Sequence, residues 1–397
     1  MPIEDNNSSG GMAHYGAPSL YPARVCPLSV LTPARCRELL QQTIAQVREG
    51  TFPYQSRPLP RRDWTLYDRA ATHEARDLLH LLGSVTETLA ERVPAWAEIP
   101  EDHVGRDPIV TLDRVRGLLW QSYRGVANRP AASELGLLAR ELGVVRDYSY
   151  STVARAYHDP EVLLALRTLL WLTNEPVMGE ERGFAIDGSG FPTAVSHHYA
   201  SSRGRQRGPE REEGAFPAVP RPWVRNVANI GLDYQLIAGW KSWTDPRKGE
   251  LSAFEEVFRM TAALHPGSQI QLGDGLYAVR WVVGEVAEAG MEARFLPRRD
   301  VTLKCLGEPA WPKSLWGLVK DPQVWLEEYH RRSRVEAFWG AIKARNPTKV
   351  RKRRVHAQVV EATLRAAVYN LRRLCYWKWV GGLDPVPDGT GPLPVEA

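Results

Sequence analysis

Residues 329–343 have the sequence YHRRSRVEAFWGAIK, which contains no proline, one glycine and good helix formers at most positions. A helix turns about 100° per residue, so residues three, four or seven apart return to one face. One stripe about 60° wide would then carry Tyr329, Arg332, Glu336 and Lys343. The stripe beside it is apolar and would carry Val335, Phe338, Trp339 and Ile342. The stretch therefore predicts a helix with one buried face and, next to it, a face on which a single carboxylate stands among cations.

Two interpretations of this polar stripe are open. Glu336 suits a metal ligand, with the neighbouring cations as a phosphate clamp. The alternative is a surface helix with internal ion pairs, which is common among charged helices. Positive charge continues beyond the helix, since residues 329–355 contain ten Lys or Arg and one acid. Such a run suits a DNA or RNA backbone, and a solvated run or a contact with an acidic protein is the alternative.

Composition places the chain among soluble globular proteins. Its 397 residues are 43% hydrophobic and 24% charged, enough for two or three domains with a large core. No run of 18 apolar residues suggests a membrane span, and the first residues lack the pattern of a secretion signal. Four scattered cysteines without CxxC spacing favour the reducing cytosol, with the Cys26/Cys36 pair as a weak candidate for half of a metal site. We therefore expect a cytoplasmic protein.

The first part of the chain is predicted to be helical. Residues 1–25 are polar and expected to be disordered, and residues 26–178 show helical patterns at 33–50, 72–93, 111–126, 133–144, 148–159 and 160–172. The span 133–159, with Ser133 as the N-cap of its first helix, resembles a helix-turn-helix. Its second helix would present Ser149, Ser151, Thr152 and Arg155 to DNA. A helical hairpin that only packs is the common alternative.

The pattern changes near residue 180, and residues 179–379 predict an α/β domain. Apolar runs typical of strands occur at 183–187, 223–233, 234–243, 269–275 and 292–298, with helical patterns at 250–265, 279–290 and 355–379. Residues 201–222 suggest a mobile basic loop, residues 300–328 look irregular, and residues 380–397 suggest a flexible tail. The first and fourth strands each end in an acid, Asp187 and Asp274.

These acids suggest a site for phosphoryl transfer. Two Mg²⁺ ions about 3.5–4 Å apart can activate an attacking oxygen and stabilise a leaving one, and Mg²⁺ prefers oxygen ligands. Adjacent parallel strands can bring Asp187 and Asp274 together, and a packed helix can add Glu336. Asp233 and Asp245 are weaker alternatives for the second ligand, because aspartates in turns are usually structural.

Three sequence blocks resemble those of the DDE transposases of bacterial insertion sequences. The spacing Tyr329-x2-Arg332-x3-Glu336-x6-Lys343 is similar to that family's Tyr-Arg-Glu-Lys signature, with Arg334, Val335 and Phe338 in matching places. Asp274-Gly-Leu-Tyr277 resembles its second block, although Gly273 and Ala278 depart from the usual pattern. Asp187, followed by Gly188, resembles its first. The resemblance covers about residues 180–375.

The resemblance implies a ribonuclease H-like mixed five-stranded sheet in the order 3-2-1-4-5, flanked by helices, behind an all-α DNA-binding region. It implies that Asp187, Asp274 and Glu336 hold two Mg²⁺ or Mn²⁺ ions, and that metal-bound water cuts the element's end so that the freed 3′-OH attacks target DNA. The partners would be double-stranded DNA, as terminal inverted repeats and as target, bound by a dimer in the nucleoid of a bacterium or archaeon. Expected DNA contacts are Tyr329, Arg332, Lys343, Arg334, Lys349, Arg351, Lys352, Arg353, Arg354 and Arg155.

Some residues keep two interpretations. Trp311, Trp316 and Trp325 are candidates for base stacking, although core packing is the default for tryptophan. His197 and His198 suit a loop or DNA contacts better than a metal site, because adjacent side chains on a strand point to opposite faces. For the whole protein, the alternatives to a transposase are an inactive DNA-binding descendant and a ribonuclease H-like nuclease that cuts without joining.

Overall fold

The computed structural model describes residues 32–56, 58, 62–99, 101, 103–105, 107–144, 148–194 and 223–391. The predictions for residues 1–25, Cys26, His197, His198 and the loop 201–222 lie outside this described part, as do the last residues of the predicted tail. Within it, no helix is both long and apolar enough to cross a membrane.

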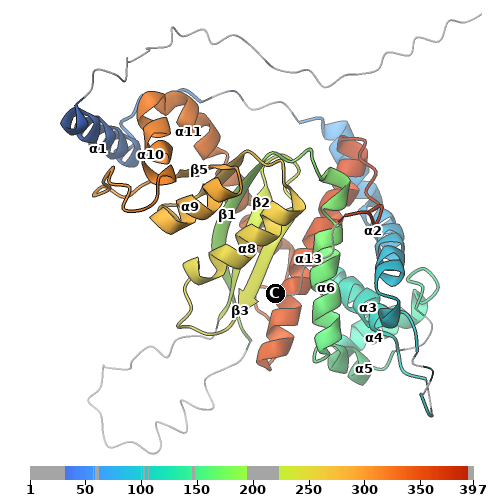
Figure 1. The fold of residues 1–397 in the computed structure, drawn as a ribbon. Helices are drawn as coiled ribbons and strands as arrows, with labels where there is room; N and C mark the ends of the chain where they lie inside the picture. The colour runs from blue at the N-terminus through green and yellow to red at the C-terminus, as the bar shows by residue number, and fades with distance from the viewer. Residues whose placement is uncertain are drawn as a thin grey trace, which may run out of the picture.

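One mixed sheet lies at the centre of the described structure (Figure 1). Its strands are β1 (Gly183–Pro192), β2 (Trp223–Gly231), β3 (Ile237–Trp243), β4 (Ile270–Gly273) and β5 (Glu292–Phe295). They lie in the order β3-β2-β1-β4-β5. β2 runs antiparallel to β1 and β3, whereas β4 runs parallel to β1 and β5. This confirms the predicted strand order and is consistent with the ribonuclease H-like fold.

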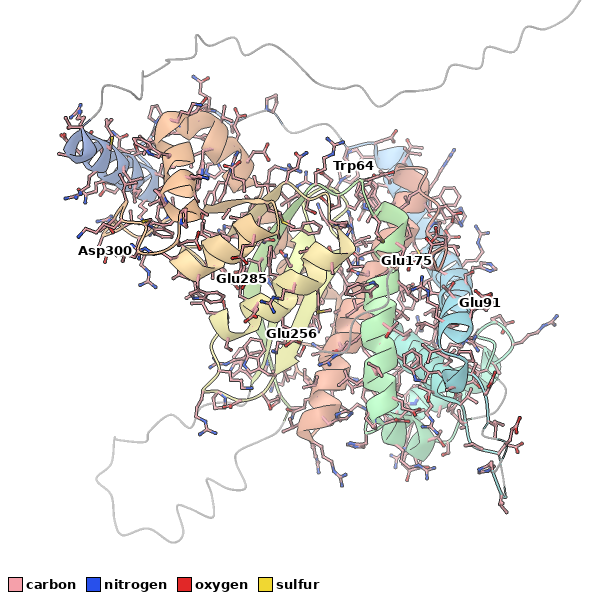
Figure 2. All side chains as sticks on the ribbon, in the orientation of Figure 1. Trp64, Glu91, Glu175, Glu256, Glu285 and Asp300 are labelled. Carbon is pink, nitrogen blue, oxygen red and sulfur yellow. The ribbon has the colours of Figure 1, made fainter. Side chains whose placement is uncertain are left out.

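Helices cover both faces of the sheet because the side chains of β1 alternate. Ile186 belongs to one apolar cluster with Phe254 of α8 (Leu251–Leu264), while Ala185 belongs to another with Phe338 of α12 (Ser333–Arg345). α8 packs closely, since an atom at the Cβ position of Gly239 in β3 would lie 2.2 Å from the Val257 carbonyl oxygen. α8 also contacts α9 (Arg280–Glu288), where Arg259 pairs with Glu285 at 3.3 Å, and Figure 2 labels Glu285 on α9.

The C-terminal helix α13 (Val355–Val380) joins the helical region to the sheet. It packs against β3 and against α2 (Trp64–Arg92), α3 (Thr111–Arg124) and α6 (Pro160–Leu172), and Figure 1 shows it beside α6. Asn370 of α13 is fully buried. Its side chain accepts a hydrogen bond from the Ile237 amide (2.8 Å) and donates one to the Thr173 hydroxyl (2.9 Å). The helical region and the sheet therefore share a core, and the predicted boundary between them stays a prediction.

The first strand is longer than predicted. β1 continues to Pro192, because the small residues after Asp187 pair with β2 as far as Trp223. Asp187 therefore lies within β1 rather than at its end. What stops near Asp187 is the parallel pairing with β4, whose last partners are Ala185 and Leu272.

The helix predicted at 133–144 begins earlier. α4 spans Asn128–Leu137, so Ser133 lies inside it and the prediction that it is an N-cap is wrong. Pro130 obscured this start, although a proline is tolerated in the first turn, where its missing N–H would have no partner. α5 (Tyr150–Ala156) is capped by Ser149, whose hydroxyl accepts from the Thr152 amide at 3.2 Å. Since residues 145–147 lie outside the described part, the helix-turn-helix stays a prediction.

The expectation of irregular structure at 300–328 is wrong. The segment contains α10 (Ala310–Lys320), and α11 (Pro322–His330) begins within it. Pro312 and Pro322 suggested a loop, but both lie in first turns, where proline does not disturb the helix. Asp321 caps α11 by accepting from the Val324 amide at 3.0 Å.

α1 (Pro33–Glu49) ends as predicted at Gly50, whose φ is 67°.

The predicted helix at 329–343 is divided between α11 and α12. Arg331 and Arg332 join them with φ of −60° and −53°. The joint keeps i to i−3 hydrogen bonds, in which the Arg332 amide donates to Tyr329 and the Val335 amide to Arg332, both at 3.0 Å. Because this geometry resembles a helical turn, the predicted stripes survive. The apolar stripe is buried as expected and comprises Val335, Phe338, Trp339 and Ile342.

The buried imidazole of His265, at the end of α8, predicts sensitivity to acid. Neither ring nitrogen has a hydrogen-bond partner among the residues that the structure describes, and the ring lies 4.9 Å from that of Phe184. Burial lowers the pKa of His265 from 6.5 to about 4. As the pH drops from about 6.5 to about 4, the unfolded chain binds a proton at His265 that the folded protein does not bind. The free energy of unfolding therefore falls over this pH range.

In His265→Phe, the free energy of unfolding should fall by roughly 3 kcal/mol less on acidification than in the wild type. This is the free energy that corresponds to the difference between the pKa of His265 in the unfolded and the folded protein. Urea unfolding at neutral pH and near pH 4.5 measures it. His80→Phe, at an exposed position of α2, is the matched control. An acid-induced loss in His265→Phe as large as in the wild type would contradict the expectation.

Candidate active site

The two predicted aspartates lie opposite each other. β1 and β4 pair in parallel with Ala185 opposite Leu272, and continuing that register places Asp187 opposite Asp274, the first residue after β4. The charges confirm that they are close. Burial, together with the negative charges of Asp274 and Glu250, raises the pKa of Asp187 to about 6. The structure thus brings together two acids that are far apart in sequence.

A further acid, Glu250, reaches the same place and was missed by the sequence reasoning. It directly precedes α8, and an atom at the Cβ position of Gly188 would lie 2.2 Å from the Glu250 carboxyl carbon. Its carboxyl group therefore lies against the backbone of the residue after Asp187. Burial and the charge of Asp274 raise the pKa of Glu250, while Arg225 lowers it. An acid beside a helix N-terminus is ordinary, because it stabilises the helix dipole. The signal that could have singled out Glu250 is the glycine that makes room for it.

The third predicted acid, Glu336, is linked to the pair through an arginine. Arg332 Nη2 lies 2.6 Å from Glu336 Oε1, and the Glu336 side chain is 57% exposed. The positive charge of Arg332 also lowers the pKa of Asp187. Within the described residues, no three His, Cys, Asp or Glu side chains converge closely enough to hold a metal ion. The charges of Asp187, Asp274 and Glu250 therefore act on one another without converging on a metal site, and the charge of Arg332 acts on both Asp187 and Glu336.

Two tyrosines lie close to these charges. Tyr277 is fully buried, and its hydroxyl has no hydrogen-bond partner. Burial raises its pKa well above 10, and the charges of Glu250, Asp187 and Asp274 add to the effect. The ring of Tyr329 stacks on Trp325 with centroids 5.0 Å apart, and Arg332 lies 5.9 Å above it. Aromatic packing thus fixes the surroundings of the acids.

The predicted lysine contacts the same strand as Asp187. Lys343 Nζ donates a hydrogen bond to Ser189 Oγ at 2.6 Å. Ser189 is two residues beyond Asp187, so both side chains project from one face of β1. The polar stripe consequently runs along β1, with Arg332, whose charge acts on Asp187, at one end and Lys343 farther along the strand.

The basic run after α12 continues along β1. Val350 forms a parallel bridge with Thr193, in which its amide donates to the Pro192 carbonyl at 2.8 Å and its carbonyl accepts from the Ala194 amide at 2.7 Å. Lys352 and Arg334 are partly buried. The exposed cations among the predicted DNA contacts are Lys343, Lys349, Arg351, Arg353, Arg354 and Arg155. Most of the predicted phosphate-binding cations are therefore accessible.

The remaining candidates divide by burial. Trp311 and Trp325 are 4% and 3% exposed, so the structure places both in the core, while Trp316 is partly buried. Asp233 pairs with Arg331 at 2.5 Å, and Asp245 accepts from the Arg247 amide at 3.0 Å. Asp233 is therefore engaged with the joint between α11 and α12, and Asp245 with its own turn.

Comparison with known proteins gives one relative. No protein-family model matches the chain. Over 257 residues it is 28% identical to the probable transposase for insertion sequence element ISA1214 of Archaeoglobus fulgidus, an alignment that covers 64% of this chain and 72% of that protein. With the sheet order and the opposed aspartates, this similarity makes the chain a distant homologue of an archaeal insertion-sequence transposase.

Proposed function

We propose that the protein is a DDE transposase that binds the ends of its insertion sequence, as a dimer on paired ends, and catalyses metal-dependent DNA cleavage and strand transfer. The observation that carries the proposal is the placement of Asp187 opposite Asp274, beside the Arg332–Glu336 pair, in a chain homologous to a transposase. Acids on adjacent parallel strands suit chemistry on a phosphodiester bond, because that chemistry needs divalent cations held by hard oxygen ligands.

The donor chemistry fits Mg²⁺ or Mn²⁺. Asp187 and Asp274 would supply the first oxygen ligands, and Glu336 would join them by turning away from Arg332. Bound divalent ions would supply activation of the attacking oxygen and stabilisation of the leaving one. The mutual repulsion that raises the pKa of Asp187 is the environment in which added positive charge is favourable.

Arg332 links DNA binding to the position of Glu336. Its guanidinium now donates to the Glu336 carboxylate, and a phosphate is an equally good bidentate partner for it. A DNA strand that binds Arg332 would therefore free Glu336 to face the two aspartates. Lys343, held on Ser189, would bind the next part of the same strand. The polar stripe would thus position the backbone while the acids prepare the site.

Incubation with Mg²⁺ and linear DNA that carries the sequences flanking the coding region tests the proposal. The expected result is cleavage at a fixed position that leaves a 3′-OH, followed by joining of that end to a target plasmid. Binding without cleavage would contradict the proposal and favour an inactive descendant. Cleavage without joining would contradict it in favour of a nuclease.

Glu250→Gln should weaken the binding of Mn²⁺ by about tenfold, the lower end of what residues around a metal site contribute. The reason is the loss of one negative charge beside Asp187 and Asp274. Calorimetric titration with Mn²⁺ measures the affinity without relying on activity. The matched control is Glu255→Gln, which removes a carboxylate that pairs with Arg259 on the exposed side of α8. Equal affinities in the two variants would exclude a contribution from Glu250.

A further inference from the structure

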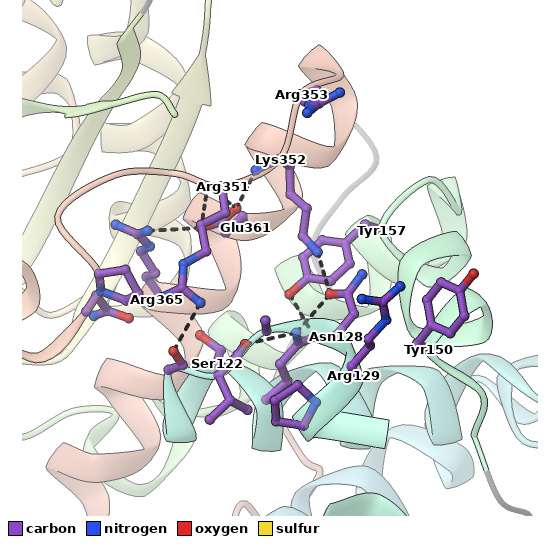
Figure 3. A pocket seen from close by; sticks show the side chains of 17 residues that line it. Ser122, Asn128, Arg129, Tyr150, Tyr157, Arg351, Lys352, Arg353, Glu361 and Arg365 are labelled. Carbon is purple, nitrogen blue, oxygen red and sulfur yellow. Dashed lines mark hydrogen bonds and ion pairs between the residues drawn. The ribbon is translucent and has the colours of Figure 1, made fainter. Parts of the chain in front are cut away.

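A cavity of about 580 Å³ lies between the helical region and the basic segment that follows α12 (Figure 3). We call it the junction pocket, and its walls include Asn128, Arg129, Tyr150, Tyr157, Arg351 and Lys352. Asn128 and Arg129 lie in α4, Tyr150 is the first residue of α5, and Tyr157 directly follows α5. Arg351 and Lys352 belong to the basic segment. The pocket is therefore built by parts of the chain that are far apart in sequence.

The lining of the junction pocket is strongly positive. Arg129, Arg353 and Arg365 contribute charge in addition to Arg351 and Lys352, and Glu361 is the acid among its described lining residues. Glu361 is already engaged, because it pairs with Arg365 at 3.0 Å and accepts from the Arg351 and Lys352 amides. A concave surface lined by one sign of charge concentrates ions of the opposite sign. The junction pocket consequently suits an anion.

Aromatic rings support two of these cations. Lys352 Nζ lies 3.4 Å from the centre of the Tyr157 ring and donates to Asn128 Oδ1 at 2.9 Å, which holds the basic segment against the helical region. Arg129 lies 5.2 Å above the ring of Tyr150, which is 54% exposed (Figure 3). An exposed arginine on an aromatic ring presents a flat cation, and such pairs suit the sugar–phosphate backbone of nucleic acids.

Two stretches of chain, β1 and α12, lead from the candidate active site toward the junction pocket. From Asp187 to Thr193, where Val350 pairs, the strand rises about 20 Å at 3.3 Å per residue. From Glu336 to Asn346, which lines the pocket, the chain advances about 15 Å at 1.5 Å per residue. Successive phosphates of one strand of duplex DNA are about 3.4 Å apart along the axis. The length along β1 and the length along α12 therefore each correspond to about four to six base pairs of duplex DNA.

We propose that the junction pocket binds backbone phosphates of the DNA duplex that is being cut, about four to six base pairs from the cleaved bond. The inference rests on the proposed transposase function for the location of the cut. It assigns Arg129 and Tyr150 of the helical region, which the sequence did not single out, to the same DNA-binding surface as the basic segment.

Arg129→Ala combined with Arg351→Ala tests the charge of the pocket. Fluorescence anisotropy, in EDTA, measures binding to a short duplex taken from the flanking sequence over a range of salt concentrations. The dependence of log affinity on log salt should become shallower by about two, because each phosphate contact contributes about 0.9. Arg259→Ala, which removes an exposed arginine of α8, should leave the slope unchanged. Replacement of both arginines by lysine should restore it, which separates loss of charge from loss of folding.

Hydroxyl-radical footprints with Ca²⁺ in place of Mg²⁺ then locate the contact relative to the mapped cut. The double alanine variant should lose protection about four to six base pairs from the cut and keep it at the cut. An unchanged salt slope, or loss of protection elsewhere, would overturn the inference and leave an acidic protein as the partner that suits the pocket. A wild type that binds with the expected slope but never cuts would defeat the transposase proposal and leave phosphate binding by the pocket standing.

Discussion

Glu336→Gln is expected to lower the rate of Mg²⁺-dependent DNA cleavage by about a thousandfold. The replacement keeps the shape of the side chain but removes the negative charge that a divalent ion requires. Charge stabilisation by a metal ion in the transition state contributes several kcal/mol, and each 1.36 kcal/mol changes the rate about tenfold. Asp187 and Asp274 remain in place in the variant, so it isolates the part that α12 contributes.

Single-turnover cleavage of end-labelled DNA measures this effect. Because Arg332 loses its ionic partner at 2.6 Å, the variant should bind DNA at least as tightly as the wild type, which anisotropy can check. Glu328→Gln is the matched control, since Glu328 pairs with Arg331 at 3.0 Å on α11 and does not contact Arg332 in the described structure. Equal cleavage rates in the two variants would remove Glu336 from the catalytic group.

Asn370→Ala is expected to lower the free energy of unfolding by about 3 kcal/mol. Asn370 is fully buried and forms hydrogen bonds to the amide and the carbonyl of Ile237 and to the hydroxyl of Thr173. A buried donor left without an acceptor costs about 1–3 kcal/mol, and the missing atoms also leave a small cavity. The Ile237 carbonyl keeps Asn174 as a donor, so the main loss falls on the Ile237 amide.

Urea unfolding followed by tryptophan fluorescence measures the change in stability. Since α13 packs on both the helical region and the sheet, the transition should remain single and move to lower urea. Gln42→Ala, at an exposed position of α1, should change stability by less than about 0.5 kcal/mol. A destabilisation in Asn370→Ala no larger than in this control would show that the buried amide does not join the two parts.

The strands and the meeting of Asp187 with Asp274 could be predicted from local patterns, whereas the order of the strands followed only from the resemblance to a known family. Apolar runs mark the strands, and an acid after a buried strand points to the edge of the sheet where parallel neighbours end. Prediction was wrong where a local signal had two meanings. Pro312 and Pro322 suggested a loop but lie in the first turns of α10 and α11. The small residues after Asp187 suggested the end of a strand but continue β1.

Gly188 alone did not reveal Glu250, and no local pattern revealed the junction pocket, because both arise from contacts between distant segments. Glu250 has the sequence context of an ordinary acid before a helix, and only the packing of α8 on the sheet brings it to Gly188. Arg129 likewise acquires its neighbours when Lys352 reaches Asn128 from the other end of the chain. The hydrophobic pattern of a helix or strand describes that element alone. It contains no information about contacts with segments that are distant in sequence.

The bridge between Thr193 and Val350 limits how the basic segment can move relative to Asp187. Because the basic segment is hydrogen-bonded to the strand that carries Asp187, the two cannot slide past each other by arbitrary amounts. Sheet register changes only in whole residues, and a shift by one residue turns the side chains to the opposite face. The distance between Asp187 and the basic segment along β1 would therefore change only in fixed increments. A relative with a longer or shorter distance would be expected to differ from this protein by two residues, or a multiple of two, in β1.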